Sequence, residues 1–280
     1  YYVKNDIPAR SGLGSSPSYY PYRLPDFLRK INFQGNIYNS NIMGGFYLLH
    51  SYPERRPLTD GRWEIYNDRI LKSILIAPTQ PYLMQGIVSK FNIKGMLLHH
   101  GSEEAISLLP KLRNTKKWRL VYYDYSASFW IREDSLRGLK TLDLGMEGLS
   151  LSKPERFEEC HLLDNFLRLM GADRLRMTNL QKALGFRIKT LKKSELLEEI
   201  GKLQLKLEMP GEAEISYQKL SDIEPKNITA LTQLAIFAAR RGDLAAAENF
   251  LYRALETSPD NKAVKENYEN IKAARQSRSN

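Results

Sequence analysis

The stretch RRGDLAAAENFLYRALETSPDN, Arg240 to Asn261, indicates where one helix stops and where the next begins and ends. Gly242 fits a helix end because glycine adopts left-handed backbone angles without steric cost, and Asp243 is a typical N-cap residue. The apolar residues that follow recur at helical spacing, and Pro259 cannot continue a helix. The stretch therefore predicts two helices joined by a tight turn, the second of which ends before Pro259.

The same pattern occurs 34 residues earlier, where Pro225 takes the place of Pro259. The residues in register are Leu197, Ile200, Gly201, Ala213, Tyr217, Leu220 and Pro225 in one window and Leu231, Leu234, Ala235, Ala247, Leu251, Ala254 and Pro259 in the next. Small residues let two helices cross closely while larger apolar residues fill the space around the crossing. These positions resemble the tetratricopeptide repeat (TPR). The resemblance implies a groove that binds other proteins, and the alternative is a purely structural spacer.

The repeats are expected to extend beyond these two windows. A degenerate earlier unit is expected from Phe157, with Gly171 at its turn and a short insertion before Ser194. After Asn261 the chain is mostly polar, which is typical of a helix that caps a solenoid. We therefore expect TPR-like helical repeats with a C-terminal capping helix over residues 154–280.

Composition limits the other possibilities. The single cysteine, Cys160, excludes an internal disulfide and a multi-cysteine zinc site. The formal net charge is +10, and up to Ser150 the chain has 20 Lys and Arg residues against 13 Asp and Glu residues, which favours anionic partners. No recognition motif accompanies this charge, so we expect no nucleic-acid partner. No apolar run approaches the roughly 20 residues of a membrane span, and because the chain begins without Met we expect it to be part of a longer protein.

The first half of the chain alternates between helical and strand patterns. Expected helices are 24–31, 44–52, 80–92 and 102–113, with a helical or irregular segment at 64–75, and expected strands are 35–39, 55–60, 93–100, 118–123 and 128–132. This alternation favours a parallel sheet between helix layers, with the last two strands as a hairpin at its edge. We predict an α/β plus all-α protein. It comprises an extended segment (1–23), a mostly parallel three-layer α/β domain with an edge hairpin (24–134), a linker (135–153) and the TPR-like helical solenoid (154–280).

Polar and glycine residues follow two of these strands in GNIYNSNIMGGFYLLHSYPERRPLTDGRWEIY, Gly35 to Tyr66. If the two strands are parallel neighbours, their carboxyl ends meet at one edge, where ligands bind in such sheets. The candidate ligand-binding residues are Asn39, Asn41, Gly44, Gly45, Asp60, Arg62 and Tyr66. The glycines would leave backbone N–H groups open to an anion, and the arginine would hold a phosphate or carboxylate. The alternative is structural: capping of turns and helices, close packing at the glycines and an Asp–Arg ion pair.

The same stretch resembles a known family. The matching residues are Gly35, Tyr38, Asn39, Gly44, Gly45, Phe46, Leu48, Tyr52, Pro53, Asp60, Gly61, Arg62 and Tyr66. They are similar to the soluble C-terminal region of bacterial polytopic membrane proteins related to lipid-linked-sugar glycosyltransferases, in which TPR repeats often follow. The resemblance covers residues 25–132. It implies a soluble domain on the periplasmic or extracytoplasmic side of the bacterial inner membrane, joined to the membrane by a region before Tyr1. The family's catalytic carboxylate is expected between membrane helices, which argues against catalysis by this chain alone.

Three functional hypotheses follow. The first is a non-catalytic extracytoplasmic interaction domain that binds a protein partner through the TPR groove and assists a membrane-embedded glycosyltransferase. The second is an α/β domain that binds a phosphate-bearing sugar donor or acceptor, such as a lipid-linked sugar, or anionic headgroups, and contributes directly to glycosyl transfer. The third is a free-standing scaffold without a membrane connection.

The histidines show no metal-site pattern. His99 and His100 end a strand, and because successive strand residues point to opposite faces, we expect one buried and one exposed histidine rather than a shared metal. The chain contains no His-Glu-x-x-His, Walker-type or Gly-x-Ser-x-Gly motif. We therefore expect no metal and no cofactor.

Overall fold

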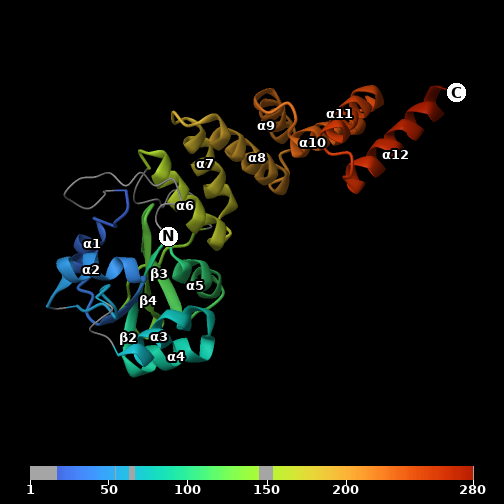
Figure 1. Ribbon diagram of the computed structural model, residues 1–280. Coiled ribbons are helices and arrows are strands. Elements are labelled where there is room, and N and C mark those ends of the chain that lie inside the picture. The colour runs from blue at the N-terminus through green and yellow to red at the C-terminus, as the bar shows by residue number, and fades with distance from the viewer. Residues whose placement is uncertain (1–17, 54, 63–66, 145–153, 280) are drawn as a thin grey trace. The chain divides into compact units, whose positions relative to one another are not determined.

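The computed structural model of the chain describes residues 18–53, 55–62, 67–144 and 154–279 (Figure 1). The chain divides into two compact units, Tyr1–Asn179 and Leu180–Asn280. The first is an α/β unit and the second is helical. Within the described ranges, no helix has both the length and the apolar character that spanning a membrane requires.

The α/β unit is built on a four-stranded sheet, counted over the residues that the structure describes. Its strands are β1 (Asn36–Asn39), β2 (Ile93–His99), β3 (Trp118–Tyr123) and β4 (Ala127–Arg132). Its helices are α1 (Leu24–Lys30), η1 (Asn41–Met43), α2 (Gly44–Ser51), α3 (Asp68–Ile76), η3 (Ala77–Thr79), α4 (Pro81–Lys90), α5 (Glu103–Arg113), η4 (Glu133–Ser135) and α6 (Phe157–Met170), and α7 (Asp173–Leu184) begins in this unit. The order across the sheet is β1-β2-β4-β3.

The sheet is mixed, so the prediction of a mostly parallel sheet was wrong. β1 pairs with β2 in parallel, whereas β4 pairs antiparallel with both β2 and β3. The run 55–60 forms no strand and makes one isolated parallel bridge, between Ile37 and Pro57. The Ile37 N–H donates to the Arg56 carbonyl at 3.3 Å, and the Leu58 N–H donates to the Ile37 carbonyl at 3.0 Å. Beyond this bridge the Asn39 side chain, rather than a backbone ladder, bonds to the segment at the Leu58 N–H and the Thr59 carbonyl.

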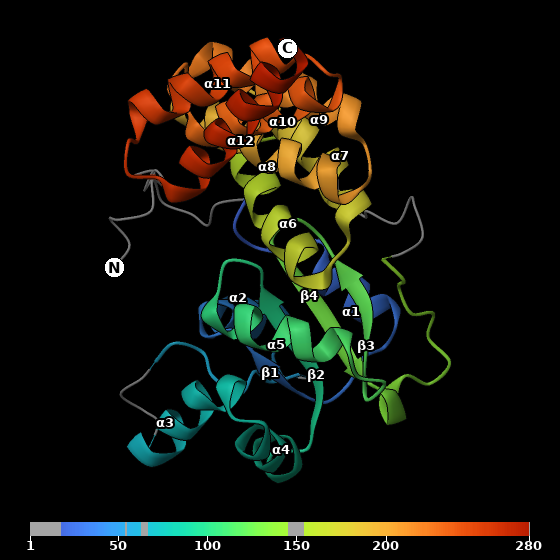
Figure 2. The same cartoon turned by 90° about the vertical axis from the view of Figure 1, so that its right-hand side faces the viewer.

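Helices cover both faces of the sheet, as the prediction of three layers requires. Figure 1 shows α1 and α2 to the left of the sheet and α5 to its right, and Figure 2 shows α5 and α6 in front of the strands. Met96 and Trp130 of the sheet are buried with residues of α3 to α6, and Ile37 and Phe129 are buried with residues of α1 and α2. The predicted hairpin is formed by β3 and β4, with β3 at the edge.

The helix pair expected as a first repeat is formed, but its first helix packs on the sheet. Gly171 ends α6 in the left-handed conformation, with φ of 65°. Leu163, Phe166 and Leu167 of α6 are buried in the same core as α5 and the sheet. The apolar face of α6 is therefore used by the α/β unit and is not left for a neighbouring repeat.

Parts of the expected N-terminal segment and linker also pack on this unit. The Ser18 hydroxyl donates to Glu159 Oε1 at 2.9 Å. Tyr20 stacks on Phe46 with ring centroids 5.0 Å apart. In the linker, the Leu142 N–H donates to the carbonyl of Leu120 in β3 at 2.8 Å. The described ends of both segments thus extend the core of the unit.

The helical unit consists of successive helix pairs and a last single helix. Its helices are α8 (Thr190–Lys206), α9 (Pro210–Ile223), α10 (Ile228–Arg240), α11 (Leu244–Thr257) and α12 (Lys262–Ser279). One buried cluster joins α8, α9 and α10, and a second joins α10, α11 and α12. Asp243 caps α11 by accepting a hydrogen bond from the Ala246 N–H at 2.9 Å, and Gly242 before it has φ of 83°.

The repeat-defining residues occupy equivalent places in the two pairs. The buried ones are Leu197, Gly201, Ala213 and Tyr217 in the first pair and Leu231, Ala235, Ala247 and Leu251 in the second. Pro225 follows the end of α9 and Pro259 follows the end of α11 at the same interval. The 34-residue spacing therefore corresponds to one structural repeat.

Candidate functional sites

Asn39, at the end of β1, joins the strand to the segment that precedes Asp60. Its buried side chain donates from Nδ2 to the Thr59 carbonyl at 2.9 Å, and its Oδ1 accepts from the Leu58 N–H at 3.0 Å. The structure thus brings the two predicted groups of site residues together, although 55–60 is not a strand. Because both ends of the Asn39 amide are bonded to backbone, this side chain acts as a tether in the described structure.

Gly44 and Gly45 begin α2 directly after the 3₁₀ turn η1. The Gly44 N–H donates to the Asn41 carbonyl, so this amide is not open to an anion as the sequence suggested. A Cβ at Gly44 would collide with the Thr59 carbonyl oxygen, whereas a Cβ at Gly45 would meet its nearest atom, the Asp60 carbonyl oxygen, at 3.7 Å. Glycine at position 44 therefore permits close packing of α2 on the 59–60 segment.

Asp60 and Arg62 form an ion pair next to this junction. The Asp60 carboxylate accepts from the Arg62 backbone N–H at 3.2 Å and from Arg62 Nε at 3.0 Å. The Asp60 side chain is 6% exposed and the Arg62 side chain is 60% exposed. The aspartate thus orients a guanidinium that faces solvent. Tyr66 lies outside the described residues.

A set of hydroxyl and carboxylate contacts joins the ends of β1 and β2, and the sequence did not single it out. Ser40 Oγ and Ser102 Oγ are 2.8 Å apart, and Ser40 Oγ also accepts from the His99 N–H at 3.0 Å. Glu104 Oε1 accepts from the Asn41 N–H at 3.1 Å. Ser102 was expected at the start of α5, and it caps that helix. Its bond to Ser40 depends on the pairing of β1 with β2, which local sequence does not encode.

Both histidines at the end of β2 are buried, so the expectation of one exposed histidine was wrong. The His99 ring lies 4.5 Å from the Tyr19 ring, and His100 stacks on Phe166 at 4.3 Å. The segment before α1 and helix α6 therefore cover the strand end from its two faces. Burial lowers the pKa of His99 to about 4 and that of His100 to about 3. Within the described ranges no group of three or more His, Cys, Asp or Glu side chains could hold a metal ion.

A row of unburied side chains runs along α8, α10 and α12. On α10 the row comprises Thr229, Gln233, Ile236 and Arg240, which recur at helical spacing on one face. Residues one repeat apart lie on the same side of a solenoid. The equivalent residues are Glu195, Glu199, Lys202 and Lys206 on α8 and Ala263, Asn267, Asn270 and Ala274 on α12, and all are exposed or half-buried. We call these twelve residues the repeat face.

No protein-family model matches the chain, and no curated protein matches it. Solved structures resemble part of it. YrrB, a TPR protein with an unusual peptide-binding site, is 18% identical over 40% of this chain and 57% of its own, with a TM-score of 0.34, so the match spans little more than half of YrrB. The type III secretion chaperone SycD of Yersinia enterocolitica, in complex with a peptide of the translocator YopD, is 18% identical over 44% of this chain and 97% of its own, with a TM-score of 0.37. PcrH from Pseudomonas aeruginosa is 16% identical over 46% and 95%, with a TM-score of 0.33.

Proposed function

We propose that the helical unit binds an extended segment of a partner protein along the repeat face. The observation that carries the proposal is Ile236, a large apolar side chain that is 36% exposed on α10 while its neighbours Ala235 and Phe237 are buried. The buried clusters between the helix pairs do not include the repeat face. An exposed apolar side chain within a polar row is a suitable anchor point for a bound peptide.

The charges along the repeat face give the bound segment a direction. Lys206 ends α8 and Arg240 ends α10, whereas Glu195 lies in the first half of α8. Lys202 is paired with Glu198 at 2.7 Å. Opposite charges on two partners set specificity and orientation more than affinity. We therefore expect a partner segment with an apolar residue at the anchor and acidic residues toward the C-terminal ends of α8 and α10.

Photo-cross-linking tests the proposal in the cells that make the protein. Ile236→benzoylphenylalanine places a reactive group on the repeat face, and Tyr252→benzoylphenylalanine places one on α11, where the native side chain is 51% exposed. Position 236 is expected to cross-link a defined segment of one protein, and position 252 is not. The mapped segment, made as a synthetic peptide, must then bind the purified protein. Equal cross-linking from both positions, or a peptide that does not bind, would contradict the proposal.

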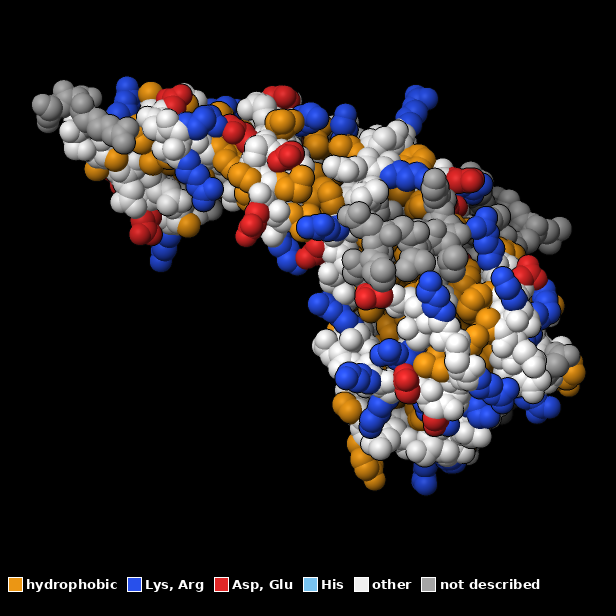
Figure 3. All heavy atoms as spheres, turned by 180° about the vertical axis from the view of Figure 1, so that it is seen from behind, with side chains coloured by type: hydrophobic (Ala, Val, Ile, Leu, Met, Phe, Trp, Pro, Cys, Tyr) orange, Lys and Arg blue, Asp and Glu red, His pale blue; other side chains and the backbone are white. Residues whose placement is uncertain are grey.

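We further propose that the chain works on the extracytoplasmic side of a bacterial inner membrane and assists a membrane-embedded glycosyltransferase. The sequence resemblance over residues 25–132 supports this setting. Figure 3 shows Lys and Arg side chains spread over one face of the α/β unit with few Asp and Glu side chains between them, a distribution suited to an anionic surface. Alkaline phosphatase fused after Asn280 of the protein, as the cells make it, should be active, since alkaline phosphatase folds only outside the cytoplasm. An inactive phosphatase fusion together with an active cytoplasmic reporter would rule out the setting.

A second candidate function is that the α/β unit binds a phosphate-bearing sugar at Arg62. The observation that favours it is the exposed guanidinium of Arg62, which the nearly buried Asp60 orients. Titration with a polyprenyl phosphate and with a nucleotide sugar tests it. Arg62→Gln is expected to weaken binding about tenfold or more, and Arg69→Gln, on the exposed start of α3, is expected to have no effect. Binding that is absent or insensitive to Arg62→Gln would exclude this candidate.

A further inference from the structure

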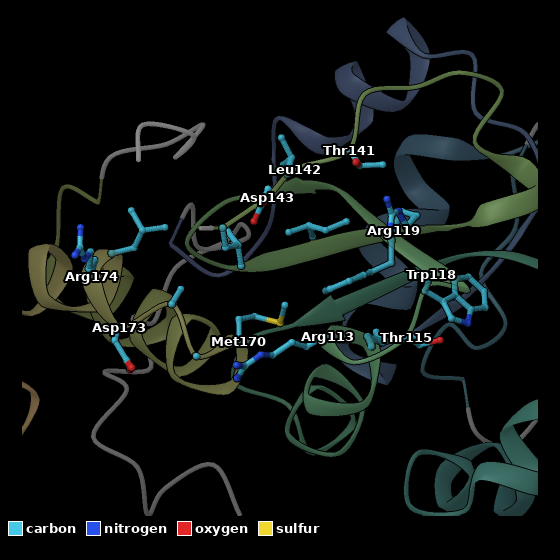
Figure 4. A pocket seen from close by; sticks show the side chains of 17 residues that line it. Arg113, Thr115, Trp118, Arg119, Thr141, Leu142, Asp143, Met170, Asp173 and Arg174 are labelled. Carbon is cyan, nitrogen blue, oxygen red and sulfur yellow. The ribbon is translucent and has the colours of Figure 1, made fainter. Parts of the chain in front are cut away.

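A pocket of about 650 Å³ opens at the β3 edge of the α/β unit (Figure 4). Its walls come from the end of α5, from β3 and β4, from residues 141–144 and from the turn between α6 and α7. Leu112, Leu120 and Trp130 are buried and give the pocket an apolar wall, which Met170 extends. Pockets that bind small molecules have volumes of about 300–1,000 Å³ and mostly apolar walls with few polar groups. This pocket has that size, and its lining combines the apolar wall with a comparable share of polar and charged groups.

Arg113 is one of three arginines that line this pocket, and its guanidinium is packed against a neighbouring turn. It is the last residue of α5, and its guanidinium packs so closely on Gly171 that a Cβ there would collide with Nη1. Figure 4 shows its side chain reaching from α5 toward Met170 at the end of α6. The structure gives Arg113 no ion-pair partner among the residues it describes. A guanidinium positioned by packing and left without a counter-charge is suited to binding an anion.

The other charges at the pocket restrict which anion fits. The charged residues of the lining are Arg113, Arg119, Arg174, Asp143 and Asp173. Arg119 pairs with Glu133 at 3.3 Å, and Arg174 and both aspartates have interactions of their own. Two carboxylates in the lining repel a ligand with several negative charges. An inorganic anion has no apolar surface that could pack against the apolar wall. The pocket therefore favours one negative charge on an apolar body.

We propose that this pocket binds a monoanionic amphiphile, a single carboxylate carried on an apolar chain. The carboxylate pairs with Arg113, which can donate two parallel hydrogen bonds to it. The chain lies on the wall formed by Leu120, Trp130 and Met170. The site is separate from the residues of the repeat face and from Asp60 and Arg62. The test of this site is therefore independent of the tests of the proposed functions.

Calorimetric titration of the full chain with octanoate, octanol and acetate separates the contributions of charge and chain. Octanoate is expected to bind, octanol to bind at least tenfold more weakly because it lacks the charge, and acetate not to bind because it lacks the chain. Arg113→Gln should weaken octanoate binding by about tenfold or more and leave octanol unchanged. Arg113→Lys keeps the charge but cannot donate two parallel hydrogen bonds, so its affinity for octanoate should lie between those of the unmodified protein and Arg113→Gln. Arg69→Gln is the matched control on α3 and should change nothing.

Quenching of tryptophan fluorescence locates the ligand. The chain has three tryptophans, Trp63, Trp118 and Trp130, and the last two line the pocket. In a Trp63→Phe background, bromine-substituted octanoate should quench the remaining fluorescence, and Arg113→Gln should shift that quenching to higher concentration. Circular dichroism establishes that each variant is folded. Equal affinity for octanoate and octanol, an unaltered Arg113→Gln variant, a lack of binding, or binding without quenching would each overturn the proposal.

Discussion

Among single residues, Gly44 has no room for a side chain. Its place at the start of α2 brings the helix backbone against the Thr59–Asp60 segment, which Asn39 holds at the end of β1. A backbone carbonyl oxygen cannot move aside as a flexible side chain can. Gly44→Ala is therefore expected to lower the free energy of unfolding by about 1–3 kcal/mol, the usual range for overpacking. Urea denaturation of the purified protein measures it.

Gly45→Ala is the matched control for that prediction. A Cβ at this position meets the Asp60 carbonyl oxygen at an ordinary contact distance of 3.7 Å. Alanine also favours the helix over glycine by about 0.5–1 kcal/mol. Gly45→Ala should leave stability unchanged or raise it slightly. Equal destabilisation by the two variants would show that the collision at Gly44 is not the cause.

The buried pair His99 and His100 makes stability depend on pH. Burial lowers both pKa values below the ordinary 6.5, so the unfolded chain takes up protons first. Their contribution is complete above pH 6.5 and is lost as the pH falls toward about 4 for His99 and about 3 for His100. Each histidine adds a slope of up to about 1.4 kcal/mol per pH unit in that range. Urea denaturation between pH 7.5 and pH 5 measures the dependence.

His100→Phe removes one of these titrating groups while keeping a ring against Phe166. The variant should show a shallower loss of stability between pH 6.5 and pH 5 than the parent protein. Comparison with the parent cancels the carboxylates, which titrate in both. His161→Phe provides the control, because the side chain of His161 is exposed. Parallel curves of stability against pH for the unmodified protein and His100→Phe would show that His100 does not contribute to the pH dependence.

Sequence reasoning placed some of these residues correctly and misplaced others, for identifiable reasons. Asn39 and Asp60 were expected side by side and lie in adjacent segments, but side-chain hydrogen bonds rather than a strand ladder bring them together. The burial of both histidines depends on Tyr19 and Phe166, which are distant in sequence. The alternation of residues in the sequence indicates which side chains share a face of a strand. It does not indicate which segments pack on that face.

At the scale of elements, the helix pairs are matched in volume at their crossings. In the first pair Gly201 faces the ring of Tyr217, and in the second the equivalent residues are Ala235 and Leu251. The smaller residue, glycine, is thus paired with the larger side chain, tyrosine, and alanine is paired with leucine. This compensation keeps each crossing filled without voids, as interiors require.

Gly201→Leu should therefore destabilise the helical unit. Even a Cβ at this position would come within 2.9 Å of the Tyr217 ring. A cost of about 1–3 kcal/mol is expected for such overpacking, measured as a lower melting temperature by circular dichroism. Gly211→Leu, on α9, has nothing within 4 Å and should have little effect. Tyr217→Ala should partly rescue Gly201→Leu in a double-mutant cycle, and purely additive effects would contradict the pairing.

The elements that the sequence predicted best are those whose signals are local. The ends of α9 and α11 follow from the spacing of Pro225 and Pro259, and the cap of α11 follows from Asp243. The strand expected at 55–60 did not form, because after one bridge to β1 the segment is held by the side chain of Asn39 and not by a backbone ladder. Helix α6 has a repeat-like pattern, but its apolar face lies in the core of the α/β unit. Which partner an amphipathic face meets is decided by tertiary packing.

At the scale of the whole molecule, the chain consists of two units with separate cores. The clusters that hold the repeats together contain residues of the helical unit alone, from Leu184 of α7 to Ile271 of α12. A fragment that begins at Asp173, and so keeps α7 whole, is therefore expected to fold by itself. Circular dichroism should show a helical spectrum and a cooperative thermal transition. A fragment without cooperative melting would mean that the units depend on each other for folding.

The binding of the cross-linked partner segment to this fragment tests the central claim most directly. Calorimetry compares the full chain, the fragment, the fragment with Ile236→Asp and the fragment with Ile215→Asp, whose native side chain is 56% exposed on α9. The repeat-face account predicts equal affinity for the full chain and the fragment. It predicts at least about tenfold weaker binding for Ile236→Asp, the loss expected for an anchor residue, and no change for Ile215→Asp. Binding that needs the α/β unit, or that tolerates Ile236→Asp, would contradict it.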